Sequence, residues 1–140
     1  MNTATHKFDG NYPEGVAVVI GGSGGIGKGI CLALAEHGAR VALSYRSNAS
    51  AAQQTVTELQ QLGHSAEAFA LELSSLEQVS AALGDLQARH QRIHTLVFAA
   101  GANITMTYVG DIDPVEWHQT IDGELNGFFH VIKTALQIGR

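Results

Sequence analysis

The sequence contains little cysteine, proline or charge. Its 140 residues include one cysteine, Cys31, and two prolines. A single cysteine excludes a disulfide framework within the chain and suits a reducing compartment, so we expect a cytoplasmic protein. Charged residues make up 15% of the chain and the net charge is −5. This charge argues against a nucleic acid partner, because phosphate backbones favour a basic surface.

Long apolar runs are also missing. No run of about 18 apolar residues occurs, so we expect no transmembrane helix and no membrane partner. The first ten residues are polar and do not resemble a signal peptide. Hydrophobic residues nevertheless make up 45% of the chain, which is enough for a buried core. We expect an irregular leader over residues 1–13 and one folded domain over residues 14–140.

Strand and helix patterns alternate along the chain. Short apolar runs predict four strands, over residues 16–20, 41–45, 66–73 and 95–100. Apolar residues spaced three or four apart predict helices between and after them. This alternation indicates the α/β class, and right-handed crossovers favour a doubly wound, Rossmann-like parallel sheet with strand order 3-2-1-4. No fifth strand is predicted, so the sheet should be incomplete at its C-terminal side.

Capping residues indicate where the later helices begin. Ser74 or Ser75 can cap the third helix, and Asp113 before Pro114 is typical of a helix start. The last pattern fits one long helix or two helices with a bend near Gly123.

A glycine-rich turn lies between the first strand and the first helix. It contains Gly21, Ser23, Gly24, Gly25, Ile26 and Gly27. Glycine allows a sharp turn and lets a phosphate approach the backbone, and the helix N-terminus that follows favours an anion. Gly27 would also let the helix lie close to the strand. This context predicts a dinucleotide site, with a tight turn that binds nothing as the alternative.

Three segments resemble the short-chain dehydrogenase/reductase family. Residues 18–27 are similar to its Thr-Gly-x-x-x-Gly-Ile-Gly loop, residues 96–101 to its Leu-Val-Asn-Asn-Ala-Gly strand, and residues 124–127 to its Asn-Leu-x-Gly segment. The resemblance extends over residues 16–136 and includes the 3-oxoacyl-carrier-protein reductases. It implies an NADP-dependent oxidoreductase that acts on a small carbonyl or alcohol substrate.

The resemblance also implies site residues. The glycine-rich turn would hold the pyrophosphate, and Glu72 with Leu73 would contact the adenine. Arg46, followed by Ser47, would pair with the 2′-phosphate of NADP, because an arginine here can make charge-assisted hydrogen bonds. NAD is less expected, since no acidic residue occupies positions 44, 45 or 47. An ordinary solvated arginine is the alternative for Arg46. The end of the fourth strand would add Ala99, Ala100 and Gly101.

Several positions depart from the family. Ile20 replaces a threonine whose hydroxyl would brace the turn, and Phe98 and Ala99 replace two asparagines. Glu124 replaces the asparagine that orders a catalytic water, so it is a candidate acid/base group, with a solvated or ion-paired glutamate as the alternative. None of the three tyrosines is followed four positions later by lysine, so the family's acid/base pair is missing.

Two questions stay open. The chain is either a fragment of a longer enzyme or a natural truncation kept for binding, and as given it should be inactive. The alternatives to an enzyme are a degenerate, non-catalytic nucleotide sensor or scaffold, and a structural subunit that pairs with a catalytic homologue. A Tyr-x-x-x-Lys motif beyond Arg140 would favour the enzyme.

The last helix carries a continuous apolar stripe. This predicts a homo-oligomer through that helix, or cover by a missing C-terminal half. We interpret Phe98, Phe128 and Phe129 as core residues.

No metal site is predicted, because His90 and His94 have no third ligand of the right kind nearby.

Overall fold

The structure is a computed structural model that describes residues 12–101 and 106–139. Residues 1–11 of the predicted leader lie outside the described part. Four parallel strands form one sheet in the order β3-β2-β1-β4, as predicted. The strands are β1 (Val16–Ile20), β2 (Val41–Tyr45), β3 (Ala66–Ala70) and β4 (Ile93–Phe98).

The predicted bounds hold for β1 and β2 but not for the two edge strands. β3 ends at Ala70, which pairs with Tyr45 at the end of β2. β4 ends at Phe98, which pairs with Ile20 at the end of β1. An edge strand has a partner on one side only, so its pairing stops where that partner stops. The prediction for β3, which extended to residue 73, was therefore too long. The prediction for β4, over residues 95–100, has the observed length but lies two residues too far along the chain, since β4 begins at Ile93.

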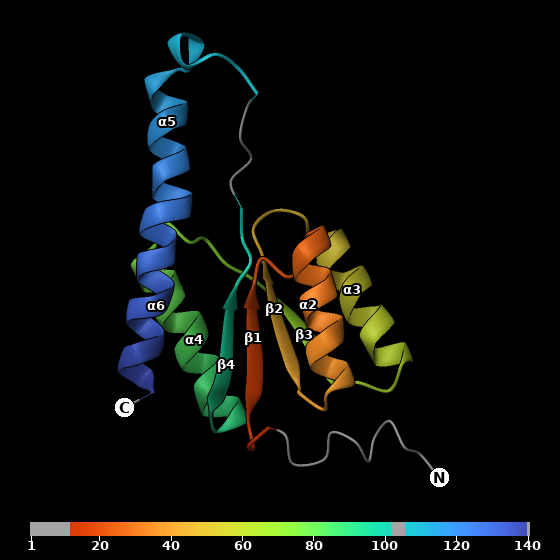
Figure 1. Cartoon of the computed structure of the whole chain (residues 1–140). Helices are drawn as coiled ribbons and strands as arrows, with labels where there is room; N and C mark the ends of the chain where they lie inside the picture. The colour runs from red at the N-terminus through yellow and green to blue at the C-terminus, as the bar shows by residue number, and fades with distance from the viewer. Residues whose placement is uncertain (1–11, 102–105, 140) are drawn as a thin grey trace.

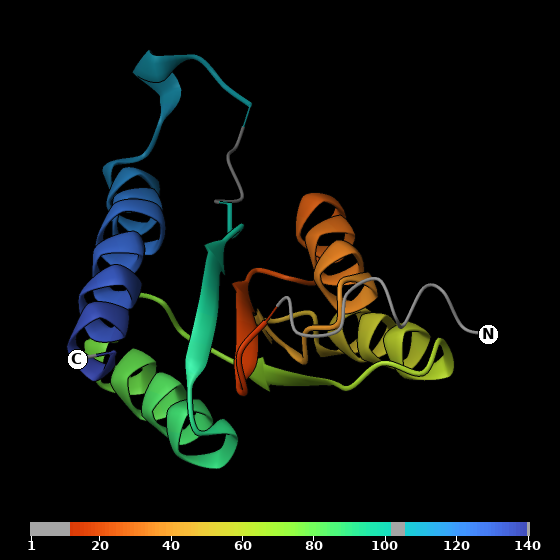
Figure 2. The ribbon, with the colours of Figure 1, turned by 60° about the horizontal axis from the view of Figure 1, so that its bottom comes forward.

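Helices cover both faces of the sheet (Figures 1 and 2). α2 (Gly25–Glu36) and α3 (Ala49–Gln61) lie on one face, and α4 (Leu76–His90) and α6 (Gly127–Ile138) lie on the other. Alternate residues of β1 face opposite cores: Val19 packs with α2 and α3, whereas Val18 and Ile20 pack with α4 and α6. All of β1 is buried, as expected for a central strand, whereas every residue of β4 is half-buried.

Side-chain caps fix three helix starts. The Asn48 side chain accepts a hydrogen bond from the Ala51 N–H at 3.0 Å, and Asp113 accepts one from the Val115 N–H at 2.8 Å. Ser75 caps α4 by accepting from the Gln78 N–H at 3.2 Å, which decides between the two predicted serines.

The last helical segment runs without a break (Figure 1). A short 3-10 turn, η1 (Val109–Asp111), precedes α5 (Pro114–Ile121). A π-helical turn, η2 (Asp122–Asn126), then joins α5 to α6, with right-handed helical backbone at both junctions. Of the two predicted alternatives, one long helix is therefore the one observed, and Gly123 lies in its π turn. Within the described residues, no helix is both long and apolar enough to cross a membrane.

Candidate nucleotide site

The four strands end at the same edge of the sheet, and a cleft lies there. Its volume is about 720 Å³. Because the strands are parallel, the segments that follow β1, β2, β3 and β4 all meet at this edge, and α5 and η2 form the opposite wall.

Most of the predicted site residues line this cleft. Those that do are Gly21, Ser23, Gly24, Arg46, Glu72, Leu73, Ala99, Ala100, Gly101 and Glu124. Gly25, Ile26 and Gly27 lie in the first turn of α2 beside it, and Ser47 is exposed after β2; these four are not part of the lining. The structure thus brings together residues that span more than one hundred positions of the chain.

The glycine-rich turn is closed on one side and open on the other. Gly21 has φ +81°, and a Cβ there would lie 2.5 Å from the Ala100 Cα. A Cβ on Gly27 would lie 2.2 Å from the Gly21 carbonyl oxygen, so α2 begins directly against the turn. A Cβ on Gly25, in contrast, would meet nothing within 4 Å. The open side leaves the backbone accessible to a ligand.

Ser44 braces this turn from the neighbouring strand. Its Oγ accepts a hydrogen bond from the Gly21 N–H at 2.9 Å, and its carbonyl oxygen accepts one from the Gly22 N–H at 3.2 Å. The sequence indicates that Ile20 lacks a bracing hydroxyl, but it does not indicate that Ser44 supplies one. The side chain of Ser44 in β2 supplies a hydroxyl to the turn after β1, and only the strand pairing brings the two together.

The start of α2 fits a phosphate. Gly24 caps the helix without a side-chain hydrogen bond, and the first turn contains no acidic residue. The first N–H groups of a helix have no partner within the helix, and the helix dipole favours an anion there. Together with the open side of the turn, these features suit the pyrophosphate of a dinucleotide.

Charges at the rim are unevenly distributed. Of the described residues that line the cleft, Arg46 alone carries a positive charge, whereas Glu72, Glu116 and Glu124 carry carboxylates. The Arg46 Nε lies 3.8 Å from the Glu72 Oε1. The other oxygen of Glu72 accepts a hydrogen bond from the Ser74 N–H at 3.4 Å.

The α5 wall was not predicted as part of the site. α5 contributes Glu116, Trp117, Gln119 and Thr120, while Ile112 lies before it and Gly123 lies in η2. Helical spacing from Glu124 back to Thr120 and Glu116 would have indicated a shared helix face. Glu124 itself lies in the π turn, and such turns occur frequently at functional sites.

Cys31 lies beneath the turn and is fully buried, as predicted. Its Sγ is 4.0 Å from the Gly22 carbonyl oxygen, and burial raises the pKa of the thiol to about 12. The thiol therefore stays protonated at neutral pH and serves as a small core group. Among the described residues, no group of three His, Cys, Asp or Glu side chains could hold a metal ion.

Comparisons with known proteins agree with this geometry. Residues 15–138 match the family model described as short chain dehydrogenase. The chain is 31% identical over 122 residues to a 3-oxoacyl-[acyl-carrier-protein] reductase of Staphylococcus aureus (strain Mu50), covering 85% of this chain and 48% of that protein. It is 29% identical to the uncharacterized oxidoreductase YgfF of Escherichia coli (strain K12), covering 87% of this chain and 49% of that protein.

A solved structure shares the fold. It is a metagenomic short-chain oxidoreductase in complex with NADP, 31% identical with a TM-score of 0.80, and the match covers 86% of this chain and 54% of that one. The chain therefore belongs to the short-chain dehydrogenase/reductase family of oxidoreductases, and the comparisons do not favour a non-catalytic sensor. It spans about half the length of the curated relatives it matches.

Proposed function

We propose that this chain is the nucleotide-binding half of an NADP-dependent oxidoreductase that acts on a carbonyl or alcohol substrate. The observation that carries the proposal is the cleft itself, in which an open glycine-rich turn lies at one end and Arg46 lies at the rim. The NADP in the similar metagenomic oxidoreductase supports the choice of cofactor. We further propose a cytoplasmic location and self-association through α6.

Each part of the cleft has a distinct role in this proposal. The turn at Gly21 and Gly24 and the start of α2 bind the pyrophosphate, and Arg46 pairs with the 2′-phosphate. Ala99 and Ala100 form the floor after β4. When bound, the reduced cofactor supplies a hydride to the carbonyl carbon. Since no tyrosine in the chain is followed four residues later by lysine, we assign cofactor binding to these 140 residues and keep Glu124, which lines the cleft, as the candidate acid/base group.

Arg46→Ala tests the cofactor assignment. We expect the unmodified chain to bind NADP⁺ more tightly than NAD⁺ by ~1–3 kcal/mol, the range for hydrogen bonds to charged groups. Arg46→Ala should remove most of this difference, mainly by weakening NADP⁺ binding. Calorimetric titration of both nucleotides measures it.

Arg40→Ala is the matched control. Arg40 is also exposed, but it precedes the other end of β2 and pairs with Glu14 at 3.3 Å. Its removal changes the net charge equally and should leave the cofactor preference unchanged. Equal affinities of the unmodified chain for NADP⁺ and NAD⁺ would contradict the proposal.

A further inference from the structure

Arg46 and Glu72 share one rim of the cleft. They follow the neighbouring strands β2 and β3, and the Arg46 Nε lies 3.8 Å from the Glu72 Oε1. The Arg46 side chain is 77% exposed and the Glu72 side chain 41% exposed. The guanidinium can therefore leave this carboxylate for another anion without disturbing the core.

Glu72 is the better-held member of the pair. Its Oε2 accepts the hydrogen bond from the Ser74 N–H, and Ser74 lies directly before Ser75, the cap of α4. The carboxylate is thus tied to a backbone segment whose position the helix start fixes. Arg46 lies after the end of β2, and its side chain is the more exposed of the two.

We propose that Glu72 reduces the preference of the cleft for NADP by competing with the 2′-phosphate for Arg46. The inference rests on the proposed function, in which Arg46 binds that phosphate. NADP must displace Glu72 from the guanidinium, whereas NAD carries a hydroxyl at this position and leaves the pair intact. Glu72 therefore weakens NADP binding relative to NAD binding, a role different from the adenine contact that the family resemblance implies.

The effect should be modest and local. An exposed ion pair contributes a small free energy, and salt screens it. Glu116 also lines the cleft, but it lies on the α5 wall and outside ion-pair distance of Arg46. Neutralising Glu116 changes the charge of the cleft by the same amount without releasing Arg46, which makes it a matched control.

Titration of NADP⁺ and NAD⁺ tests the inference on the full 140-residue chain. Glu72→Gln should raise the ratio Kd(NAD⁺)/Kd(NADP⁺) by roughly two- to fivefold, the range for loss of an exposed ion pair. Glu72→Asp retains the charge but shortens the reach, so it should raise the ratio less. Glu116→Gln should change the ratio less than Glu72→Gln, and 0.5 M salt, on the order of three times the physiological level, should reduce the rise.

A double-mutant cycle assigns the effect to Arg46. In an Arg46→Ala background, Glu72→Gln should leave the ratio unchanged. An unchanged or lower ratio for Glu72→Gln, or an equal rise without Arg46, overturns this inference and leaves the proposed function intact. Equal affinities in the unmodified chain overturn both. Each variant is first checked for folding by thermal melting. Where Glu72→Gln does not fold, the Kd ratio of Glu72→Asp is compared with that of the unmodified chain instead.

Discussion

Gly27 and Gly29 lie two residues apart on α2 but have different surroundings. A Cβ on Gly27 would lie 2.2 Å from the Gly21 carbonyl oxygen and 2.8 Å from the Gly22 Cα, both of which belong to the backbone. A Cβ on Gly29 would meet nothing within 4 Å. Gly27 is therefore needed for the contact between helix and turn, whereas Gly29 is a helix residue with no such constraint.

We expect opposite effects from two alanine substitutions. Gly27→Ala should lower the free energy of unfolding by about 1–3 kcal/mol, as overpacking does, and abolish NADP⁺ binding because the turn must move. Gly29→Ala should raise it by up to about 1 kcal/mol, because alanine favours a helix over glycine. Urea unfolding of both variants measures this. A Gly27→Ala chain as stable as the Gly29→Ala chain would contradict the geometry.

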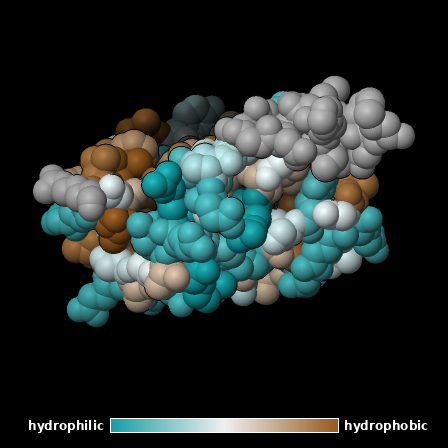
Figure 3. All heavy atoms as spheres, turned by 90° about the horizontal axis from the view of Figure 1, so that it is seen from below, coloured by the Kyte–Doolittle hydropathy of each residue, from teal (hydrophilic) through white to brown (hydrophobic). Residues whose placement is uncertain are grey.

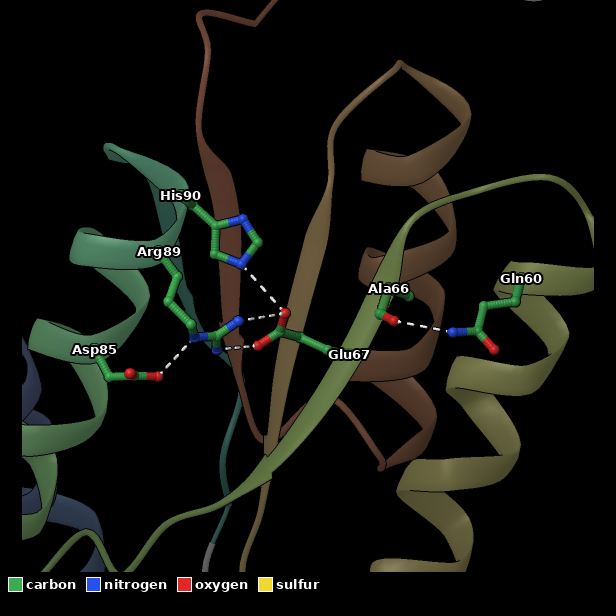
Figure 4. A network of polar contacts seen from close by, with 6 residues as sticks. All are labelled: Gln60, Ala66, Glu67, Asp85, Arg89 and His90. Carbon is green, nitrogen blue, oxygen red and sulfur yellow. Dashed lines mark hydrogen bonds and ion pairs between the residues drawn. The ribbon is translucent and has the colours of Figure 1, made fainter.

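At the scale of elements, an ion-pair network joins the edge strand β3 to α4 (Figure 4). The Arg89 guanidinium donates to both oxygens of Glu67, with Nη1 3.1 Å from Oε2, and its Nε donates to Asp85 at 2.9 Å. The His90 Nε2 lies 3.2 Å from the same Glu67 oxygen. Glu67 thus accepts hydrogen bonds from two neighbouring residues of α4.

The network predicts a pH-dependent contribution to stability. Hydrogen bonds from Arg89, together with those from His90, hold the pKa of Glu67 below its usual value of 4.5, although partial burial opposes them. A lowered folded-state pKa adds stability above pH 4.5, and this stability is lost as the pH falls through the lowered value. We expect Glu67→Gln to cost about 0.5–1 kcal/mol at pH 7, because the pair is partly exposed, and nothing at low pH.

Urea unfolding at several pH values measures this difference. Glu36→Gln is the control, because Glu36 is an exposed carboxylate on α2 far from the network in sequence. The Glu67→Gln and unmodified chains differ in free energy of unfolding at pH 7. If this difference stayed constant down to acidic pH, it would be evidence against a role of the Glu67 charge.

Helices, strands and turns could be predicted where the signal lies within a short stretch of sequence. The apolar runs of β1 and β2, the Asp113 cap and the glycine-rich turn are all signals within a few residues. The ends of β3 and β4 were not predictable, because their partner strands determine them. The hydrogen bond from the Gly21 N–H to Ser44 and the pair of Arg46 with Glu72 were missed for the same reason, since each joins segments that only the sheet brings together.

At the scale of the whole molecule, the end of η2 and α6 together leave an apolar face uncovered. Leu125, Phe129 and Leu136 are 62%, 60% and 66% exposed. Figure 3 shows apolar surface on the side of the molecule where α6 lies, and a mostly hydrophilic surface in the centre of that view. The interpretation of the three phenylalanines as core residues was wrong for Phe129 and for Phe128, which is 46% exposed. The Phe128 ring nevertheless lies edge-on to the half-buried Phe98, with ring centroids 5.2 Å apart.

This face is a candidate surface for self-association. Apolar groups that line one helix side by side form a patch of the kind that marks an interface. Its lining residues are Leu125, Asn126, Phe128, Phe129, Ile132, Lys133, Leu136 and Gln137. β4 also favours association, because it is a half-buried edge strand that pairs with β1 alone among the described strands. We therefore expect the 140-residue chain to sediment as a dimer or larger species at micromolar concentration.

Two lysine substitutions test whether association depends on this patch or on exposed apolar residues in general. Leu136 on α6 and Leu62 at the end of α3 are 66% and 62% exposed, so each can accept a lysine without loss of core packing. Leu136→Lys places a charge in the α6 patch and should shift the sedimentation profile toward the monomer, because a buried unpaired charge opposes association. Leu62→Lys adds the same charge on the other face of the sheet and should leave the profile unchanged. The prediction would be refuted if the unmodified chain sedimented as a monomer and melted cooperatively. The chain would then be stably folded with the α6 face exposed to water.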